Sequence, residues 1–327
     1  MKNNIFKWII RILVCIIVFI LVVFAVFSVG ERFMFLAFYR NSDRYESVPG
    51  LLDGYIAQGY TMVDGEDYRL ACGYMTGKKS SRIYILTDDG EASYVEMKQS
   101  DGSNYTGHTG GIGVYGDYVY ITATTGCDLF LLSDVTDGDG VATKVDEVLT
   151  INDPAYCVIH DGMLYVGSFY HAGDYETPSE HRLTTPAGDN NTAILTAYRL
   201  DPETGKTNSD IPDYVYSTTS FAQGMAFTGD GRIIISTSYG LTKSHLYVYD
   251  LNEATVDNKG FSVDGVAVPL IYLDSNCLIN DIVAPPMAEE IIYDDGVVYI
   301  MNESASNKYH FGKLTSGTHV YGYKLDK

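Results

Sequence analysis

The feature that most constrains the fold of this chain is a short segment that recurs after about residue 55. Each copy is a run of alternating apolar residues that ends in a turn rich in Asp and Gly, a pattern typical of β-hairpins. A second and a third strand-like run follow each copy, and a fourth follows most of them. The five copies begin with residues 58–65, 110–117, 155–162, 223–231 and 289–296.

A repeated unit of four short strands predicts a β-propeller. We therefore expect an all-β domain over residues 53–327 with five blades, the fourth strand of the fourth copy being Val268–Tyr272. A count of six blades would follow if the long stretches 165–215 and 250–280 were divided differently. A β-sandwich is the alternative architecture, but it would not explain why the copies recur in the same register.

The last copy has three strands before the chain ends at Lys327. A propeller often closes by pairing an N-terminal strand with its last blade, which removes an exposed sheet edge. We expect residues 44–52, within a stem of residues 30–52, to supply that strand.

Residues 8–29 form an apolar run whose one charge, Arg11, lies near its start. About 20 apolar residues are enough to cross the hydrocarbon core of a bilayer as a helix. Lys2, Lys7 and Arg11 precede or begin the run, so the positive-inside rule places residues 1–7 in the cytoplasm and the rest of the chain outside. We expect a single-pass anchor in the cell membrane.

A cleaved signal peptide is the alternative to this anchor. The run is longer than the apolar part of a typical signal peptide, which favours an uncleaved segment. A second apolar patch, Phe33–Tyr39, is flanked by Arg32, Arg40 and Arg44. Cationic side chains are favourable near anionic headgroups, so this patch is expected at the bilayer surface.

The exported part is strongly acidic. The whole chain has 42 acidic and 22 basic residues, and all the acidic ones follow Gly30. Such a surface repels phosphate backbones, so nucleic acid is excluded as a partner. Four cysteines lie outside the membrane segment, and their wide spacing does not indicate a zinc site. Both disulfides and buried free thiols remain open for Cys72, Cys127, Cys157 and Cys277.

The residues that open each copy should form a ring around one mouth of the central channel. The polar side chains there either bond water and neighbouring backbone at a solvated mouth or form a ligand site: Gln58, His108, Tyr156, Gln223, Glu289 and Glu290. Gly59, Gly111 and Gly224 follow in three copies and would permit close backbone approach. The long loop from His171 to Ala193 should lie over the same mouth, as a lid or as a solvated surface loop.

Several short motifs resemble those of secreted bacterial propellers in the broad gluconolactonase-like and strictosidine-synthase-like group. They are Gln58-Gly59, Ser81–Tyr84, His108–Ile112 and Gln223–Ala226. The resemblance implies a metal at the central channel held by carboxylate and amide side chains. Glu289, Glu290 and Asn280 have the right chemistry, and oxygen ligands suit Ca²⁺ or another hard divalent cation.

The sequence contains none of the common catalytic motifs, so several functions stay open. The first is a binding module that presents one face to a glycan, a small molecule or an envelope protein. The second is a metal-assisted hydrolase or lyase that acts on a lactone or sugar at the channel mouth. The third is a structural part of an envelope complex. Fold alone does not choose among them.

Overall fold

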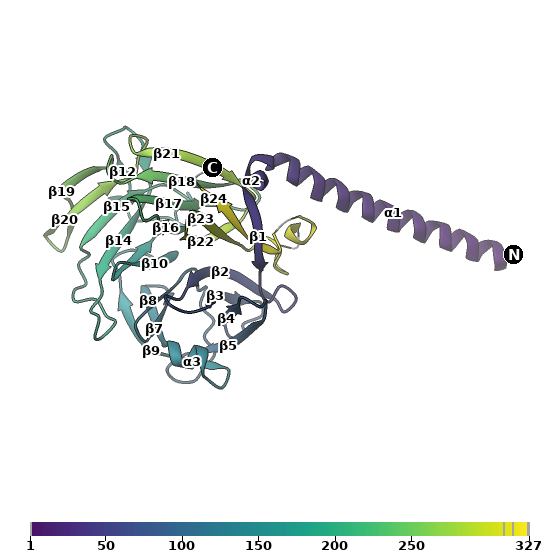
Figure 1. Cartoon of the computed structure of the whole chain (residues 1–327), viewed down its shortest axis with the longest axis horizontal. Coiled ribbons are helices and arrows are strands. Elements are labelled where there is room, and N and C mark those ends of the chain that lie inside the picture. The colour runs from purple at the N-terminus through teal and green to yellow at the C-terminus, as the bar shows by residue number, and fades with distance from the viewer. Residues whose placement is uncertain (1, 310, 316, 326–327) are drawn as a thin grey trace.

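The computed structural model describes residues 2–309, 311–315 and 317–325 (Figure 1). Helix α1 (Lys2–Met34) extends away from a mostly β domain. Its span Ile5–Met34 reaches a mean hydropathy of 3.5, and this apolar part is not buried by the rest of the protein. It is the one helix among the described residues that is long and apolar enough to cross a membrane. Both an anchor and a signal sequence have these properties.

The strands form sheets around a common centre (Figure 1). Two four-stranded units are joined into one sheet by the parallel pair β5–β9. The first unit contains β2 (Tyr55–Met62), β3 (Tyr68–Met75), β4 (Arg82–Thr87) and β5 (Ala92–Lys98). The second contains β6 (Ile112–Tyr115), β7 (Tyr118–Thr122), β8 (Gly126–Leu131) and β9 (Val141–Leu149).

Three further units complete the circle. The third contains β10 (Tyr156–His160), β11 (Met163–Gly167), β14 (Ala193–Arg199) and β15 (Tyr214–Thr218), extended by β20 (Val266–Tyr272) and β19 (Thr255–Val263). The fourth contains β16 (Ala222–Phe227), β17 (Arg232–Thr237), β18 (Ser244–Asp250) and β21 (Leu278–Ala284). The last contains β22 (Ala288–Asp294), β23 (Val297–Asn302), β24 (His319–Lys324) and β1 (Ser42–Ser47).

The smaller elements lie in the connections between these strands. They are α2 (Leu36–Arg40), α3 (Leu132–Thr136), the short hairpin β12 (Leu183–Thr184) and β13 (Asn190–Asn191), and two 3₁₀ turns, η1 (Ser179–His181) and η2 (Phe311–Leu314).

The first strands of the units contact one another in a closed order: β2, β6, β10, β16, β22 and again β2. The backbones come very close there. A Cβ on Gly111 would lie 2.4 Å from the Cys157 nitrogen, and one on Gly224 would lie 2.6 Å from Cα of Glu290. The expected role of these glycines is therefore confirmed, because only a residue without a side chain fits between adjacent inner strands.

The predicted closing strand is present as β1, which pairs antiparallel with β24. The expectation for Phe33–Tyr39 at the bilayer surface is wrong for part of the segment. Phe35 and Phe38 are 5% and 3% exposed and pack into the core between the last two units, beside Ile234 and Ile291. Burial of two aromatic rings outweighs an interfacial position, and it fixes the end of α1 to the β domain.

Residues 266–272 do not complete the fourth unit as predicted. They form β20, which pairs in parallel with β15 of the third unit. The fourth unit is completed instead by β21, which pairs antiparallel with β18. Both runs have the same β pattern, so sequence alone did not distinguish which one joins which sheet.

Candidate functional site

Three inner strands carry a β-bulge at the positions that the repeat aligns. The register shifts between Ala57 and Gly59 in β2, between Ala222 and Gly224 in β16, and between Ala288 and Ile291 in β22. The residues in these bulges are Gln58, Gln223 and the pair Glu289-Glu290. A bulge releases a residue from the ladder and redirects its side chain, which is how these polar groups come to lie at one end of the inner strands.

The backbone just before several inner strands is also unusual. Thr109, Phe221 and Met287 have φ values of 56°, 64° and 65° and lie directly before Gly110, Ala222 and Ala288. A left-handed conformation is uncommon for residues other than glycine, and it is most costly for a β-branched residue such as Thr109. Such strain is retained where the surrounding structure imposes it, and it is concentrated at functional sites.

Two carboxyl groups meet at this end of the channel. Glu289 in β22 is 1% exposed and Glu303, directly after β23, is 8% exposed. Burial, and then the charge of Glu303, raises the pKa of Glu289 well above its usual range. Burial raises the pKa of Glu303 to about 7, although Lys308 opposes the shift. Two desolvated carboxyls in contact cannot both ionise readily, so at neutral pH the pair shares a proton.

Hydrogen-bonding groups surround Glu303. The side-chain amide of Gln58 donates a 2.9 Å hydrogen bond to Oε2 of Glu303. The hydroxyl of Tyr309 interacts with the same carboxyl, which contributes to a raised Tyr309 pKa after the larger effect of burial. One oxygen of Glu289, Oε1, has no donor among the described residues. The pair is thus only partly satisfied by the protein.

Aromatic rings and a lysine form the outer edge of this site. His108 stacks on Tyr74 with ring centroids 4.8 Å apart. Lys308 donates a 2.7 Å hydrogen bond to the Tyr74 hydroxyl. The His108 side chain reaches solvent on one side, yet its crowded surroundings and then the charge of Lys308 lower its pKa, so the imidazole is neutral at pH 7. We call Gln58, Tyr74, His108, Glu289, Glu303, Lys308 and Tyr309 the mouth cluster.

The side chain of Glu290 does not join the mouth cluster, although Glu290 follows Glu289 directly in β22. It is fully buried, and its Oε2 lies 2.9 Å from the position that a Cβ on Gly111 would occupy. Burial raises its pKa well above the usual range, while the backbone amides of Ile112 and Met225 oppose the shift. Neither of its oxygens has a hydrogen bond of good geometry among the described residues. Glu290 therefore sits between inner strands, inside the channel, where burial favours the neutral form of its carboxyl group.

The remaining predicted site residues are dispersed. Tyr156 is fully buried in the core between the third and fourth units, with its ring against Gly167. Gln223 is half-buried in its bulge. Asn280 is exposed on β21, three strands out from the channel in its sheet. The structure thus does not bring Asn280 to Glu289 and Glu290, because residues 278–284 form an outer strand.

The described residues contain no group of three or more His, Cys, Asp or Glu side chains that could hold a metal ion. The mouth cluster could offer a cation the carboxylate oxygens of Glu289 and Glu303 and the amide oxygen of Gln58. The amide nitrogen of Gln58 is hydrogen-bonded to Glu303. Cys72, Cys127, Cys157 and Cys277 are all free, buried thiols.

The loop from His171 to Ala193 reaches the mouth with its first part only. His171 stacks on Tyr239 at 4.1 Å, and Phe169, Phe221 and Tyr175 pack around them. The second part turns away: Asn191 donates hydrogen bonds of 2.9 Å to Ser217 and Leu273, on the third unit. The expected lid is therefore a short aromatic rim, because the hairpin β12–β13 is tied down beside its own sheet.

Four members of the mouth cluster were not predicted from the sequence: Tyr74, Glu303, Lys308 and Tyr309. Tyr74 lies at the end of β3, and the other three lie in or beside the loop 303–318. In the repeat, the connection between the second and third strands opens at the same face as the start of the first strand. That rule would have directed attention to these residues as well as to the strand starts.

Comparison with known proteins found structural likeness at low identity and no relative in sequence. The sequence matches no known protein family and no curated protein. Among solved structures, the chain is similar to the GH43_1 enzyme from Xanthomonas citri, with 12% identity, a TM-score of 0.44, and coverage of 88% of this chain and 91% of that one. A putative glucose dehydrogenase from Thermus thermophilus has 13% identity, a TM-score of 0.43 and coverage of 86% and 98%.

A third such structure, the glutaminyl cyclase of Myxococcus xanthus, has 9% identity, a TM-score of 0.41 and coverage of 80% and 91%. These are β-propeller matches, and at such identity they carry nothing about activity. The chain is a mostly β protein of propeller type with an N-terminal apolar helix.

Proposed function

We propose that the protein is a membrane-anchored, extracytoplasmic propeller of five blades that binds a small polyhydroxylated ligand, such as a sugar unit of a glycan, at its mouth cluster. The closed order of the inner strands supports five blades. The exposed apolar surface of α1 supports the anchor, and the basic residues at its start support a cytoplasmic N-terminus.

The observation that carries the proposal is the contact of Glu289 with Glu303. A pair of carboxyls that shares one proton offers a donor and an acceptor side by side, which matches the two roles of a hydroxyl group. Oε1 of Glu289 is buried and has no donor among the described residues, so it would accept a hydrogen bond from a hydroxyl that entered the mouth. The pair retains negative charge, so it disfavours phosphates and carboxylates as ligands. Tyr74 and His108 add an aromatic surface at the edge of the same site.

The test is binding of purified full-length protein to a glycan array and, for any hit, titration calorimetry with the free sugar. We expect Glu303→Gln to lower affinity at least tenfold, since the shared proton is lost from the pair. Asn280→Ala is the matched control, because Asn280 is polar and exposed on an outer strand, and it should leave affinity unchanged. Binding to no glycan, or equal binding by the Gln variant, would refute the proposal.

One observation favours a second candidate, an enzyme that acts on the same ligand. A carboxyl with a pKa of about 7 is suited to general acid or base catalysis near neutral pH, and a partner carboxyl with a different pKa completes such a pair. Turnover of a bound sugar or lactone, lost in both Glu289→Gln and Glu303→Gln, would establish this candidate. Metal analysis of the protein before and after chelation tests the metal-assisted form of the reaction.

A further inference from the structure

An apolar groove lies where α1 meets the propeller. It has a volume of about 400 Å³ and is walled on one side by Val26, Phe27, Gly30, Glu31 and Met34 of α1. The propeller supplies the other wall through residues from the loops 238–243, 285–287 and 303–318: Leu241, Pro285, Pro286, Ser304, Phe311 and Thr315. Helix α1 contacts η2, which belongs to the loop 303–318.

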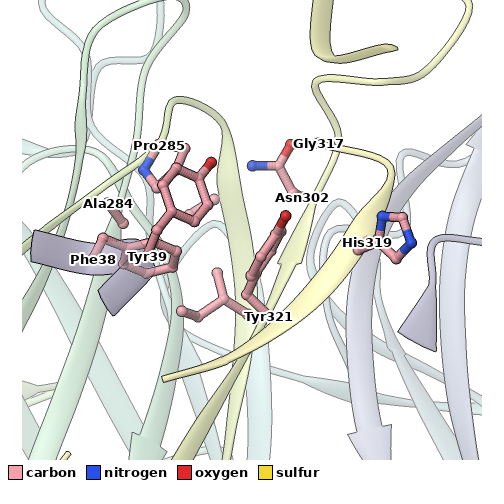
Figure 2. Close-up of a pocket in the computed structure, with 10 residues that line it drawn as sticks. Phe38, Tyr39, Ala284, Pro285, Asn302, Gly317, His319 and Tyr321 are labelled. Atoms are coloured by element: carbon pink, nitrogen blue, oxygen red, sulfur yellow. The ribbon is translucent and has the colours of Figure 1, made fainter. Parts of the chain in front are cut away.

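The junction that holds these loops beside α1 is packed rather than loose. Phe38 and Tyr39 of α2 lie over Tyr321 of β24, and Figure 2 shows this arrangement around a small cavity. The Tyr39 hydroxyl donates a hydrogen bond to Glu31 at the end of α1. The guanidinium of Arg32 lies 5.3 Å from the centre of the Tyr39 ring. The position of these loops along the axis of α1 is therefore fixed.

At this position along α1, apolar side chains of the loops lie at the level of the lipid bilayer. Val26 and Phe27 belong to the apolar run of α1, so a groove that they line extends to the depth of the acyl chains. Leu241, at the tip of the loop after β17, is 70% exposed, and Phe33 and Met34 are 70% and 77% exposed. Apolar side chains of this size gain about 1.5–3 kcal/mol each when they leave water.

The charges of the same loops differ from those of the rest of the domain. The loops 238–243 and 303–318 contain Lys243, Lys308 and Lys313 against one acidic residue, the buried Glu303, and Glu31 of α1 is the one acidic residue that lines the groove itself. Arg32 is exposed beside them at the end of α1. In a chain with a formal charge of −20, a basic edge around an apolar groove is complementary to anionic headgroups.

We propose that this groove takes a lipid acyl chain and that the loops 238–243 and 303–318 rest on the outer leaflet. This inference depends on the anchor part of the proposed function. Because Glu303, Lys308 and Tyr309 lie in the second loop, contact with the membrane also places the mouth cluster next to the bilayer surface. The site is then reached by ligands that lie close to the membrane.

The experiment uses the full chain in nanodiscs of phosphatidylcholine and phosphatidylglycerol, with one copy per disc, and tryptophan quenching by lipids brominated on their acyl chains. Trp8 is the one native tryptophan and reports whether α1 is in the bilayer. In a Trp8→Phe background, Leu241→Trp reports on the groove. Val266→Trp is the matched control, since Val266 is also apolar and exposed, at the tip of the β19–β20 hairpin on the opposite side of the propeller (Figure 1).

We expect bromolipid to quench the tryptophan at 241 at least twofold and acrylamide in the water to quench it little, with the reverse for the one at 266. Quenching of Trp8 without quenching at 241 would overturn the inference and leave the anchor intact. An unquenched Trp8 would refute the anchor itself. Protection at 241 from both quenchers would mean that protein covers the groove, which also overturns the inference.

Discussion

The side-chain amide of Gln58 donates a hydrogen bond to Glu303 across 245 residues of sequence. It links the first inner strand to the loop after β23, at the place where the ring of units closes. Gln58 is 3% exposed, and it also donates to the carbonyl of Ala57 at 2.9 Å. This contact therefore joins the first and last units of the propeller, and it also holds Glu303 in place at the proposed ligand site.

Gln58→Ala should destabilise the protein by about 1–3 kcal/mol, because it leaves a buried carboxyl oxygen without its donor. Denaturant unfolding followed by circular dichroism measures this. Gln223→Ala is the control: Gln223 occupies the equivalent bulge of β16 but is half-buried and makes no hydrogen bond to a carboxylate in the described structure. Equal losses for the two variants would show that the bulge, and not the Glu303 contact, is responsible.

The raised pKa of Glu303 predicts a pH dependence of stability. The ordinary pKa is 4.5 and the folded value is about 7, so between these values the folded protein keeps a proton that the unfolded chain has lost. Stability should then fall as pH rises through this window, by up to about 3 kcal/mol from this group. Glu303→Gln should remove this part of the slope, whereas Glu253→Gln, an exposed turn variant, should not. A Glu303→Gln profile with the parent slope would contradict the assignment.

Gly111→Ala should cost several kcal/mol, because its Cβ would lie 2.4 Å from the backbone nitrogen of Cys157 and that strand has nowhere to move. Gly113→Ala, two residues further along, is the control. Its Cβ would meet the Ile159 side chain at 3.0 Å, and a side chain can shift. Thermal unfolding of the two variants should rank them in that order, and a reversed order would argue against backbone contact between β6 and β10.

Phe38→Ala should destabilise the last unit by about 3–5 kcal/mol, as expected for a buried aromatic residue. Phe33→Ala, from the same segment but 70% exposed, should change stability by less than about 0.5 kcal/mol. Unfolding in detergent compares them. If both variants unfolded with the same stability as the parent protein, residues 35–40 would not be packed into the propeller. That result would contradict a rigid junction between α1 and the β domain.

The thiols offer a further check on the core. Cys72, Cys127, Cys157 and Cys277 are free and buried, and burial raises the pKa of the Cys72 and Cys277 thiols. They should resist alkylation in the folded protein and react once it unfolds, since only the thiolate is reactive. The same protein unfolded in denaturant serves as the positive control. Mass spectrometry under non-reducing conditions would reveal any disulfide, which would contradict the free state of these residues.

Much of the architecture could be predicted from local pattern. The alternation of apolar residues and the Asp-Gly turns indicated the inner strands, and the missing strand of the last copy indicated β1. The apolar run indicated α1, although the helix extends to Met34 and its junction is buried. The bulge residues Gln58 and Glu289 were predicted at the mouth because the repeat aligns them, and Glu290, aligned in the same way, points into the channel instead.

Local pattern was enough to predict the inner strands, their turns and the end of each unit that holds polar residues, because these depend on neighbours a few residues apart. The tertiary structure alone decided that β20 joins the third unit and β21 the fourth, which moves Asn280 away from Glu289. It also decided that Glu303 meets Glu289 and Gln58. Contacts of this kind form only when the ring closes, since closure brings together side chains whose separation along the chain has no periodic pattern.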